Sequence, residues 1–233
     1  MQPEIQPTGG YRPVTVEQFS PAQQRVMRNT YLLLALTMVP TVIGALIGIS
    51  TGGIVMQHPV ASSLLMLAAV IALQFAIIAN RNSATGVVLL LGMTFLLGWW
   101  LGPLLSIALA LKNGAQLIGL AAGGTGIIFF VMAGIATTTK KDFSFMGKFL
   151  FVGMIVLLLA MIVNLFLHIP ALALTISSLV VVVFSLFLLH DVSRIVTGGE
   201  TNYIIATTGV YLSLFNIFAN LLQLLMAFSG DRD

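Results

Sequence analysis

The sequence contains no cysteine and few charged side chains, and each of these features excludes some classes of protein. Without a thiol there is no disulfide and no thiolate metal site, although this absence leaves the redox compartment undetermined. Charged residues make up 7% of the chain and hydrophobic residues 58%, whereas an ordinary soluble domain is about 25% charged. One soluble core cannot hide so much apolar surface. We therefore expect an integral membrane protein whose solvent is the lipid bilayer.

Seven apolar stretches are long enough to span a membrane, because a helical crossing takes about 20 apolar residues. They run approximately over Tyr31–Ile49, Val60–Ala79, Gly86–Ile107, Ala115–Ala136, Phe149–His168, Pro170–Leu189 and Ile205–Phe228. The fifth and sixth are separated by almost nothing, which predicts a tight helical hairpin around Pro170. The expected fold class is all-α, with seven transmembrane helices.

The first 29 residues differ from the rest in being polar and rich in proline. They lack an apolar run after a basic start, so we expect no signal peptide. The predicted organisation is a flexible cytoplasmic tail over residues 1–29, a seven-helix domain over residues 30–229 and a short terminal tail over residues 230–233.

Basic residues are distributed unevenly between the two sides of the predicted bundle. Lys and Arg near span ends resist translocation, so they accumulate on the cytoplasmic side. With seven crossings, the side of the amino terminus carries Arg12, Arg25, Arg28, Arg81, Lys140, Lys141, Lys148 and Arg194, and the opposite side carries Lys112 and Arg232. This bias predicts a cytoplasmic amino terminus and a carboxyl terminus on the other face.

The ionisable residues do not form a pattern typical of catalysis, metal binding or nucleic-acid binding. The basic residues are scattered rather than gathered in a stripe, which argues against a nucleic-acid partner. His58 and His168 belong to one face and His190 lies a full span away, so we expect no metal site. No nucleophile has a plausible base and no phosphate loop is present. We expect no catalytic residue, no cofactor and no enzymatic activity.

Small residues recur every four positions in the fourth span, at Ala115, Gly119 and Gly123. Such spacing makes a flat face on which another helix can approach closely. We expect this face to be a helix–helix packing surface.

The last span carries an unusual number of polar side chains on one side. At about 100° per residue, Ser213, Asn216, Asn220 and Gln223 form one ridge, and Asn202 continues it toward the amino-terminal side. Unmet polar groups cost several kcal/mol in lipid, so the last span should be wrapped by the others. The ridge either bridges neighbouring helices by hydrogen bonds or lines a hydrated path for a cation. The sequence leaves both interpretations open.

Asp191 is a second anomaly, because it follows the sixth span where the negative end of the helix dipole disfavours a carboxylate. Arg194 is the local candidate for a partner cation and Arg81 the distant one. A hydrated aspartate at the membrane surface is the alternative. Burial disfavours the charged form, so a buried Asp191 predicts a proton-sensitive latch.

Four segments together resemble the Bax inhibitor-1 family of seven-span membrane proteins, in particular its bacterial YccA-like branch. They are "TTTKKDFSFMG", "FLHIPALALTIS", "LLHDVSRIVTGGETNYIIAT" and "YLSLFNIFANLLQLL". The resemblance covers the chain from Arg28 to about Leu225. It implies a bacterial inner-membrane protein whose last helix is surrounded by the other six.

The resemblance implies two functions. The YccA-like branch implies modulation of the membrane protease FtsH, and the polar tail before Arg25 would offer that protease a loose end. Calcium-leak members carry paired aspartates, one in the sixth span and one in the seventh. Asp191 matches the first, but Ser213 stands at the second position, so paired-carboxylate pH gating is not expected.

Overall fold

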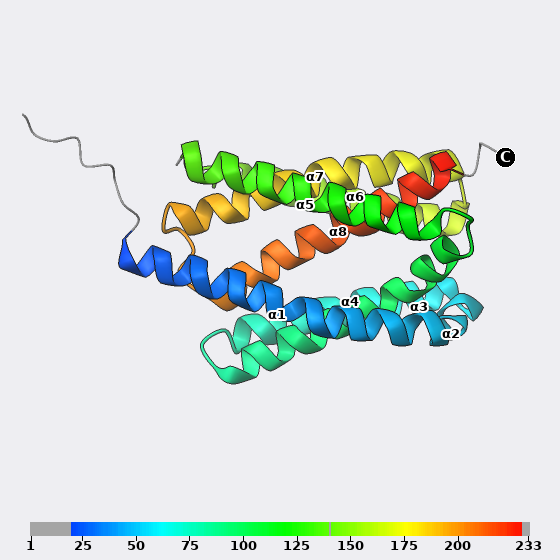
Figure 1. Cartoon of the computed structure of the whole chain (residues 1–233), viewed down its shortest axis with the longest axis horizontal. Coiled ribbons are helices and arrows are strands. Elements are labelled where there is room, and N and C mark those ends of the chain that lie inside the picture. The colour runs from blue at the N-terminus through cyan, green and yellow to red at the C-terminus, as the bar shows by residue number, and fades with distance from the viewer. Residues whose placement is uncertain (1–19, 140, 230–233) are drawn as a thin grey trace, which may run out of the picture.

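The computed structural model describes residues 20–139 and 141–229 and folds them into helices joined by short connections (Figure 1). Seven helices are long and apolar enough to cross a membrane, which confirms the predicted number of spans. They are α1 (Pro21–Thr51), α3 (Pro59–Ala79), α4 (Ala84–Leu109), α5 (Gly114–Thr139), α6 (Met146–Leu167), α7 (Pro170–Val196) and α8 (Tyr203–Ser229). A short helix, α2 (Gly53–Gln57), connects α1 to α3. The tails predicted for residues 1–19 and 230–233 lie outside the described residues.

The first helix begins at Pro21, so the prediction of a flexible tail is wrong for residues 21–29. Ser20 and Gln23 form a capping box: the Ser20 hydroxyl accepts from the Gln23 amide at 3.2 Å, and the Gln23 side chain accepts from the Ser20 amide at 2.8 Å. Pro21 suits the first helical position because its missing N–H would be unpaired there anyway. These local signals start α1 well before its apolar run.

The connection between α6 and α7 is the tight hairpin that the sequence predicts. His168 ends α6 in the left-handed conformation, with φ of 53°, and its amide donates to the Asn164 carbonyl at 2.8 Å. The Asn164 side chain then accepts from the Ile169 amide at 3.1 Å. Pro170 starts α7 at once.

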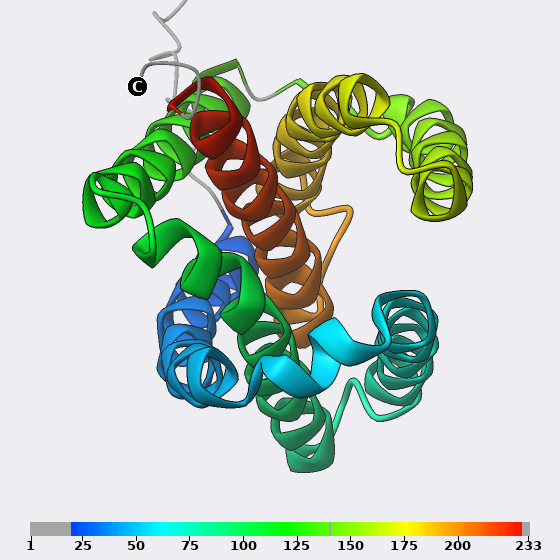
Figure 2. The same cartoon turned by 90° about the vertical axis from the view of Figure 1, so that its right-hand side faces the viewer.

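Helix α8 runs through the middle of the bundle (Figure 2). It packs against α7, α5, α1, α4 and α3, and no side chain from Tyr203 to Met226 is exposed. The predicted burial of the last span is therefore confirmed. Helix α6 departs from the expected ring of six, because it packs mainly against the outside of α7.

The closest helix pairing joins α1 to α4 through glycines spaced four residues apart on both helices. A Cβ built on Gly44 or Gly48 would collide with the backbone of Phe95 or Trp99, and one built on Gly98 or Gly102 would collide with the backbone of α1. Close backbone approach of this kind drives association in lipid. We call these four glycines the α1–α4 glycine seam.

The small-residue face predicted on α5 is not a packing surface. Ala115, Gly119 and Gly123 are all exposed, and a Cβ on either glycine would meet no atom within 4 Å. The four-residue spacing is the same as in the α1–α4 glycine seam. What differs is whether another helix lies opposite.

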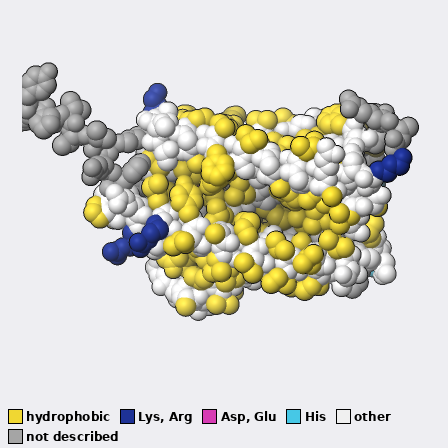
Figure 3. Space-filling model, in the orientation of Figure 1, with side chains coloured by type: hydrophobic (Ala, Val, Ile, Leu, Met, Phe, Trp, Pro, Cys, Tyr) yellow, Lys and Arg dark blue, Asp and Glu magenta, His cyan; other side chains and the backbone are white. Residues whose placement is uncertain are grey.

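The face of the molecule shown in Figure 3 is largely apolar, with basic side chains toward its two ends. Large apolar side chains of α6 are strongly exposed, including Phe149 at 77% and Phe166 at 61%. Lipid is the solvent that such a surface fits. The bundle has two ends along its helices: the near end is the one where α1 begins, and the far end is the one that contains α2 and the α6–α7 hairpin.

Candidate functional site

The polar ridge of α8 faces α7. At the near end, a Cβ on Gly209 would lie 2.6 Å from the Asp191 carboxylate. At the far end, the Ser177 hydroxyl donates to the Gln223 side chain at 3.1 Å. In two antiparallel helices that pair without a shift, the numbers of facing residues have a constant sum. Here the sum is 400 for both pairs, so α7 and α8 keep the same register between the two contacts. We call this contact, bounded by Asp191–Gly209 and Ser177–Gln223, the α7–α8 seam.

The ridge has the spacing that a continuous helix–helix seam requires. Gly209, Ser213, Asn216, Asn220 and Gln223 are separated alternately by four and three residues, which keeps them on one side of a helix against a partner. The sequence pattern therefore predicted the correct face of α8 without naming the helix opposite.

In the middle of the α7–α8 seam, the amides bond to their own helix. Asn216 donates to the Leu212 carbonyl and Asn220 to the Asn216 carbonyl, each at 2.8 Å. The buried residues of this part of α7 include the apolar Val180 and Leu188 and also Ser185, whose hydroxyl donates to the Val181 carbonyl of its own helix. Of the three amides of the ridge, Gln223 bridges two helices as the packing interpretation expects, whereas Asn216 and Asn220 satisfy their donors locally.

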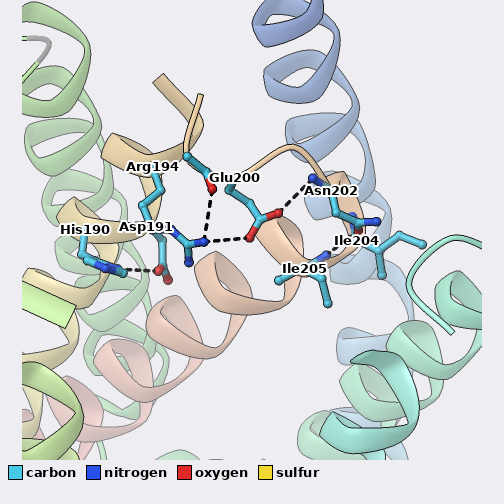
Figure 4. Close-up of polar contacts among 8 residues, drawn as sticks. His190, Asp191, Arg194, Glu200, Asn202, Ile204 and Ile205 are labelled. Atoms are coloured by element: carbon cyan, nitrogen blue, oxygen red, sulfur yellow. Dashed lines mark hydrogen bonds and ion pairs between the residues drawn. The ribbon is translucent and has the colours of Figure 1, made fainter. Parts of the chain in front are cut away.

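At the near end, Asp191 lies inside α7 rather than beyond it, because the helix continues to Val196. Its carboxylate accepts from His190 Nδ1 at 3.0 Å, and the two side chains are 19% and 11% exposed (Figure 4). The other ring nitrogen of His190 packs on α6, 2.8 Å from where a Cβ on Gly147 would lie. His190 and Asp191 thus join α6, α7 and α8 at one point.

Arg194 was the local candidate for the partner of Asp191, but its hydrogen bonds are with other groups. Its guanidinium donates to Glu200 and to the Gly199 carbonyl, both at 3.3 Å (Figure 4). The chain turns back at Gly198, where φ is 80°, and the Glu200 amide bonds to the Arg194 carbonyl. This turn brings a carboxylate from the α7–α8 loop to the arginine.

Asn202 was expected to extend the polar ridge, but it is the cap of α8. Its side-chain oxygen accepts from the amides of Ile204 and Ile205 at 3.0 and 3.1 Å. Its side-chain nitrogen donates to the Arg81 carbonyl and to Asn82, at 2.8 and 2.9 Å. Arg81 therefore reaches this region through its backbone, and its side chain is exposed.

The hydroxyl of Ser193 ties the α5–α6 loop to the same end. Ser193 donates to the Lys141 carbonyl at 2.8 Å and accepts from the Phe143 amide at 3.1 Å. In that loop, hydrogen bonds from the side chain and then the backbone of Ser144 hold the pKa of Asp142 below its usual value, with smaller contributions from nearby His190 and Arg194.

Ser213 occupies the position at which the resemblance led us to look for a second aspartate. It is 2% exposed and lies one helical turn beyond Gly209, on the ridge that faces α7. Asp191 therefore packs next to this position, against a glycine.

Several bridging residues gave no signal in the sequence. The Tyr211 hydroxyl lies 2.8 Å from the Thr41 hydroxyl of α1, and Thr207 donates to the Thr30 carbonyl of α1 at 3.3 Å. Tyr211 and Thr207 lie on the side of α8 opposite the ridge. Threonine and tyrosine are ordinary in apolar helices, so sequence reasoning passed over them.

The far end of the α7–α8 seam opens into a hollow of about 390 Å³ between α6, α7 and α8. Its polar lining comprises Asn164, His168, Ser177 and Gln223. Its apolar lining comprises Met161, Leu165, Ile169, Pro170, Ala173 and Ile176. We call this space the far-end hollow.

A bundle of seven spans built around a polar-edged last helix defines a class of membrane protein, and comparison with known families identifies it. Residues 23–230 match the family model described as inhibitor of apoptosis-promoting Bax1. The chain belongs to this family, the Bax inhibitor-1 family.

Individual relatives are similar over nearly their whole length. An uncharacterized membrane protein of Vibrio cholerae is 41% identical over 86% of this chain and 88% of its own. The modulator of FtsH protease YccA of Escherichia coli K12 is 40% identical over 89% of this chain and 92% of its own. An equally similar protein of another Escherichia coli strain is named inner membrane protein YccA. With its seven apolar helices, the present chain is a multi-pass inner-membrane protein.

Proposed function

We propose that the protein modulates an FtsH-type membrane protease and is not itself an enzyme. The observation that carries this proposal is the 40% identity, over 92% of the relative, to a protein named modulator of FtsH protease. We place the near end in the cytoplasm, because Arg25, Arg28, Arg81, Lys148 and Arg194 belong to it. This orientation presents the start of α1 to a cytoplasmic protease.

The packing of α1 supports a role as a slowly extracted occupant of the protease. A protease that grips the chain before Ser20 would pull on α1, which packs extensively on α4 and is held by the α1–α4 glycine seam in its far half. At its start, Gln23 donates to the Val196 carbonyl at 2.9 Å and ties α1 to the end of α7. Because α1 must separate from α4 before it leaves the bundle, the protease would be occupied for longer than by a loosely packed substrate.

The test compares the wild type with Gly48→Leu and with the matched control Gly119→Leu. Leucine at position 48 would meet the α4 backbone, whereas position 119 faces open space. In cells that contain FtsH, overproduced wild type should slow the turnover of another membrane substrate. Gly48→Leu should be degraded several-fold faster and lose this effect, whereas Gly119→Leu should behave as wild type. Unchanged turnover of the other substrate on overproduction and on deletion would refute the proposal.

Cation leak is the second candidate, and the placement of Asp191 against α8 favours it. A carboxylate at the near end of the α7–α8 seam would attract a cation such as calcium. Purified protein in liposomes should then pass calcium at a rate that changes with Asp191→Asn. Ser213→Asp should introduce pH dependence, because two close carboxylates do not both ionise freely. Flux equal to that of empty liposomes would exclude this function.

A further inference from the structure

The far-end hollow combines hydrogen-bond donors with an apolar wall. Gln223 lines the space, and its side-chain oxygen accepts from the Ser177 hydroxyl, while its amide nitrogen has no hydrogen-bond partner among the described residues. Asn164 also lines the space, and its side-chain oxygen accepts from the Ile169 amide, while its amide nitrogen likewise has no partner among the residues that the structure describes. Its described lining contains no carboxylate. The site therefore suits a ligand that accepts hydrogen bonds and carries an apolar body.

The depth of Gln223 is close to the level of phospholipid ester oxygens. Helix α8 has 27 residues and is about 40 Å long, close to the full thickness of a bilayer with its headgroups, about 40–45 Å. Gln223 lies six residues before the last residue of α8, about 9 Å from its end. Because the hydrocarbon core is about 30 Å thick, about 5 Å of α8 extends beyond it at each end, so Gln223 lies about 4 Å on the hydrocarbon side of the boundary with the headgroups.

The hollow is also accessible from the lipid side. Helix α6 packs on α7 and leaves the α8 side of the hairpin open, and the lining of the hollow includes the exposed apolar side chains of Met161 and Ile169. A volume of about 390 Å³ lies within the usual range of small-molecule sites, roughly 300–1,000 Å³. Amide donors facing hydrocarbon would be costly if unmet.

We propose that the far-end hollow binds one phospholipid from the adjacent leaflet. Its phosphate or ester oxygens accept hydrogen bonds from Asn164 and Gln223, and its acyl chains lie along α6. The bound lipid fills the wedge between the α6–α7 hairpin and α8. This inference is independent of the protease and of ion leak.

Native mass spectrometry of the full chain in detergent, titrated with phosphatidylglycerol or phosphatidylethanolamine, tests the proposal. The double variant Asn164→Leu/Gln223→Leu should bind its tightest phospholipid about tenfold more weakly, since two donors are lost. Asn113→Leu is the matched control, because Asn113 is a far-end amide bonded to Ser229 outside the hollow. Its binding should equal that of wild type.

Two outcomes would overturn the proposal. One is equal phospholipid affinity in wild type and the double variant. The other is binding of inorganic phosphate that depends on both amides while phospholipid binding does not, which would indicate a site for a soluble anion.

Photo-crosslinking of the wild type tests the same site without relying on the double variant being folded. A phospholipid with a photoreactive group near its headgroup should form adducts concentrated in residues 161–177 and around Gln223. Adducts spread evenly over the exposed faces of the bundle would contradict a defined site.

Discussion

The two ends of the α7–α8 seam use polar side chains in different ways. At the near end, His190, Asp191, Arg194 and Glu200 are engaged with one another or with neighbouring backbone, and three loops meet there. At the far end, one bond between Ser177 and Gln223 closes the seam beside a hollow. The same ridge of α8 therefore ends in a hydrogen-bonded polar cluster at the near end and beside an open hollow at the far end.

The largest expected effect comes from adding a methyl group at the near end. In Gly209→Ala, the new Cβ would lie 2.6 Å from Asp191, so the carboxylate must move away from α8. The atoms that the methyl group meets belong to the end of a side chain, so we expect a loss of about 1 kcal/mol in unfolding free energy, the lower end of the range for overpacked sites. Thermal or denaturant unfolding in detergent measures this loss.

Gly119→Ala is the control for that variant. Its Cβ meets no atom within 4 Å, so the better helix propensity of alanine should leave stability unchanged or raise it by up to about 1 kcal/mol. Equal effects of the two substitutions would show that the near end is no more tightly packed than the open face of α5.

A smaller effect is expected at the far end. Ser177→Ala removes the bond to Gln223, and helix-bridging bonds in membranes contribute about 0.6 kcal/mol on average. Ser178→Ala serves as the control, because that hydroxyl is exposed and bonds to its own helix. A loss at position 177 as large as that at Gly209 would remove the contrast between the two ends.

The smallest effect concerns the α5–α6 loop at the near end. In Ser144→Ala the pKa of Asp142 should rise toward its ordinary value, because the strongest group that lowers it is lost. The Ser144 backbone amide still donates, so the rise should be partial. Carbon-13 NMR titration of the Asp142 carboxyl measures it, with Ser178→Ala as the unaffected control.

The pH dependence of this contribution has a definite sign. Since folding lowers the pKa of Asp142, the hydrogen bonds stabilise the folded loop at neutral pH and cease to do so as the pH falls through the lowered value. The wild type and Ser144→Ala should therefore differ at neutral pH and converge in acid. A difference that grows in acid would contradict the assignment.

Much of the fold was predictable because the bilayer imposes simple rules. Apolar length gave the seven spans, and the polar ridge gave the buried face of the last one. The early start of α1 could also have been predicted from the helix-start signals at Ser20, Pro21 and Gln23, but the length of the apolar run alone did not indicate it.

The predictions that were wrong concern contacts between elements, because a contact depends on which element lies opposite a given residue in the folded bundle. Spacing of small residues describes a flat face but not its partner, so Gly119 was taken for a packing residue while Gly48 was overlooked. Arg194 was a candidate partner of its helical neighbour Asp191, whereas the turn at Gly198 delivers Glu200 instead. Long-range contacts of this kind are set by the whole bundle.

The α1–α4 glycine seam also constrains the order of assembly during synthesis. Helix α1 emerges from the ribosome long before α4, so its two glycines have no partner until α2, α3 and most of α4 have followed. The nascent amino-terminal half must therefore remain loosely associated in the bilayer until α4 inserts. Only then can the first helix settle, which makes the arrival of the fourth helix the step that commits this half to its final arrangement.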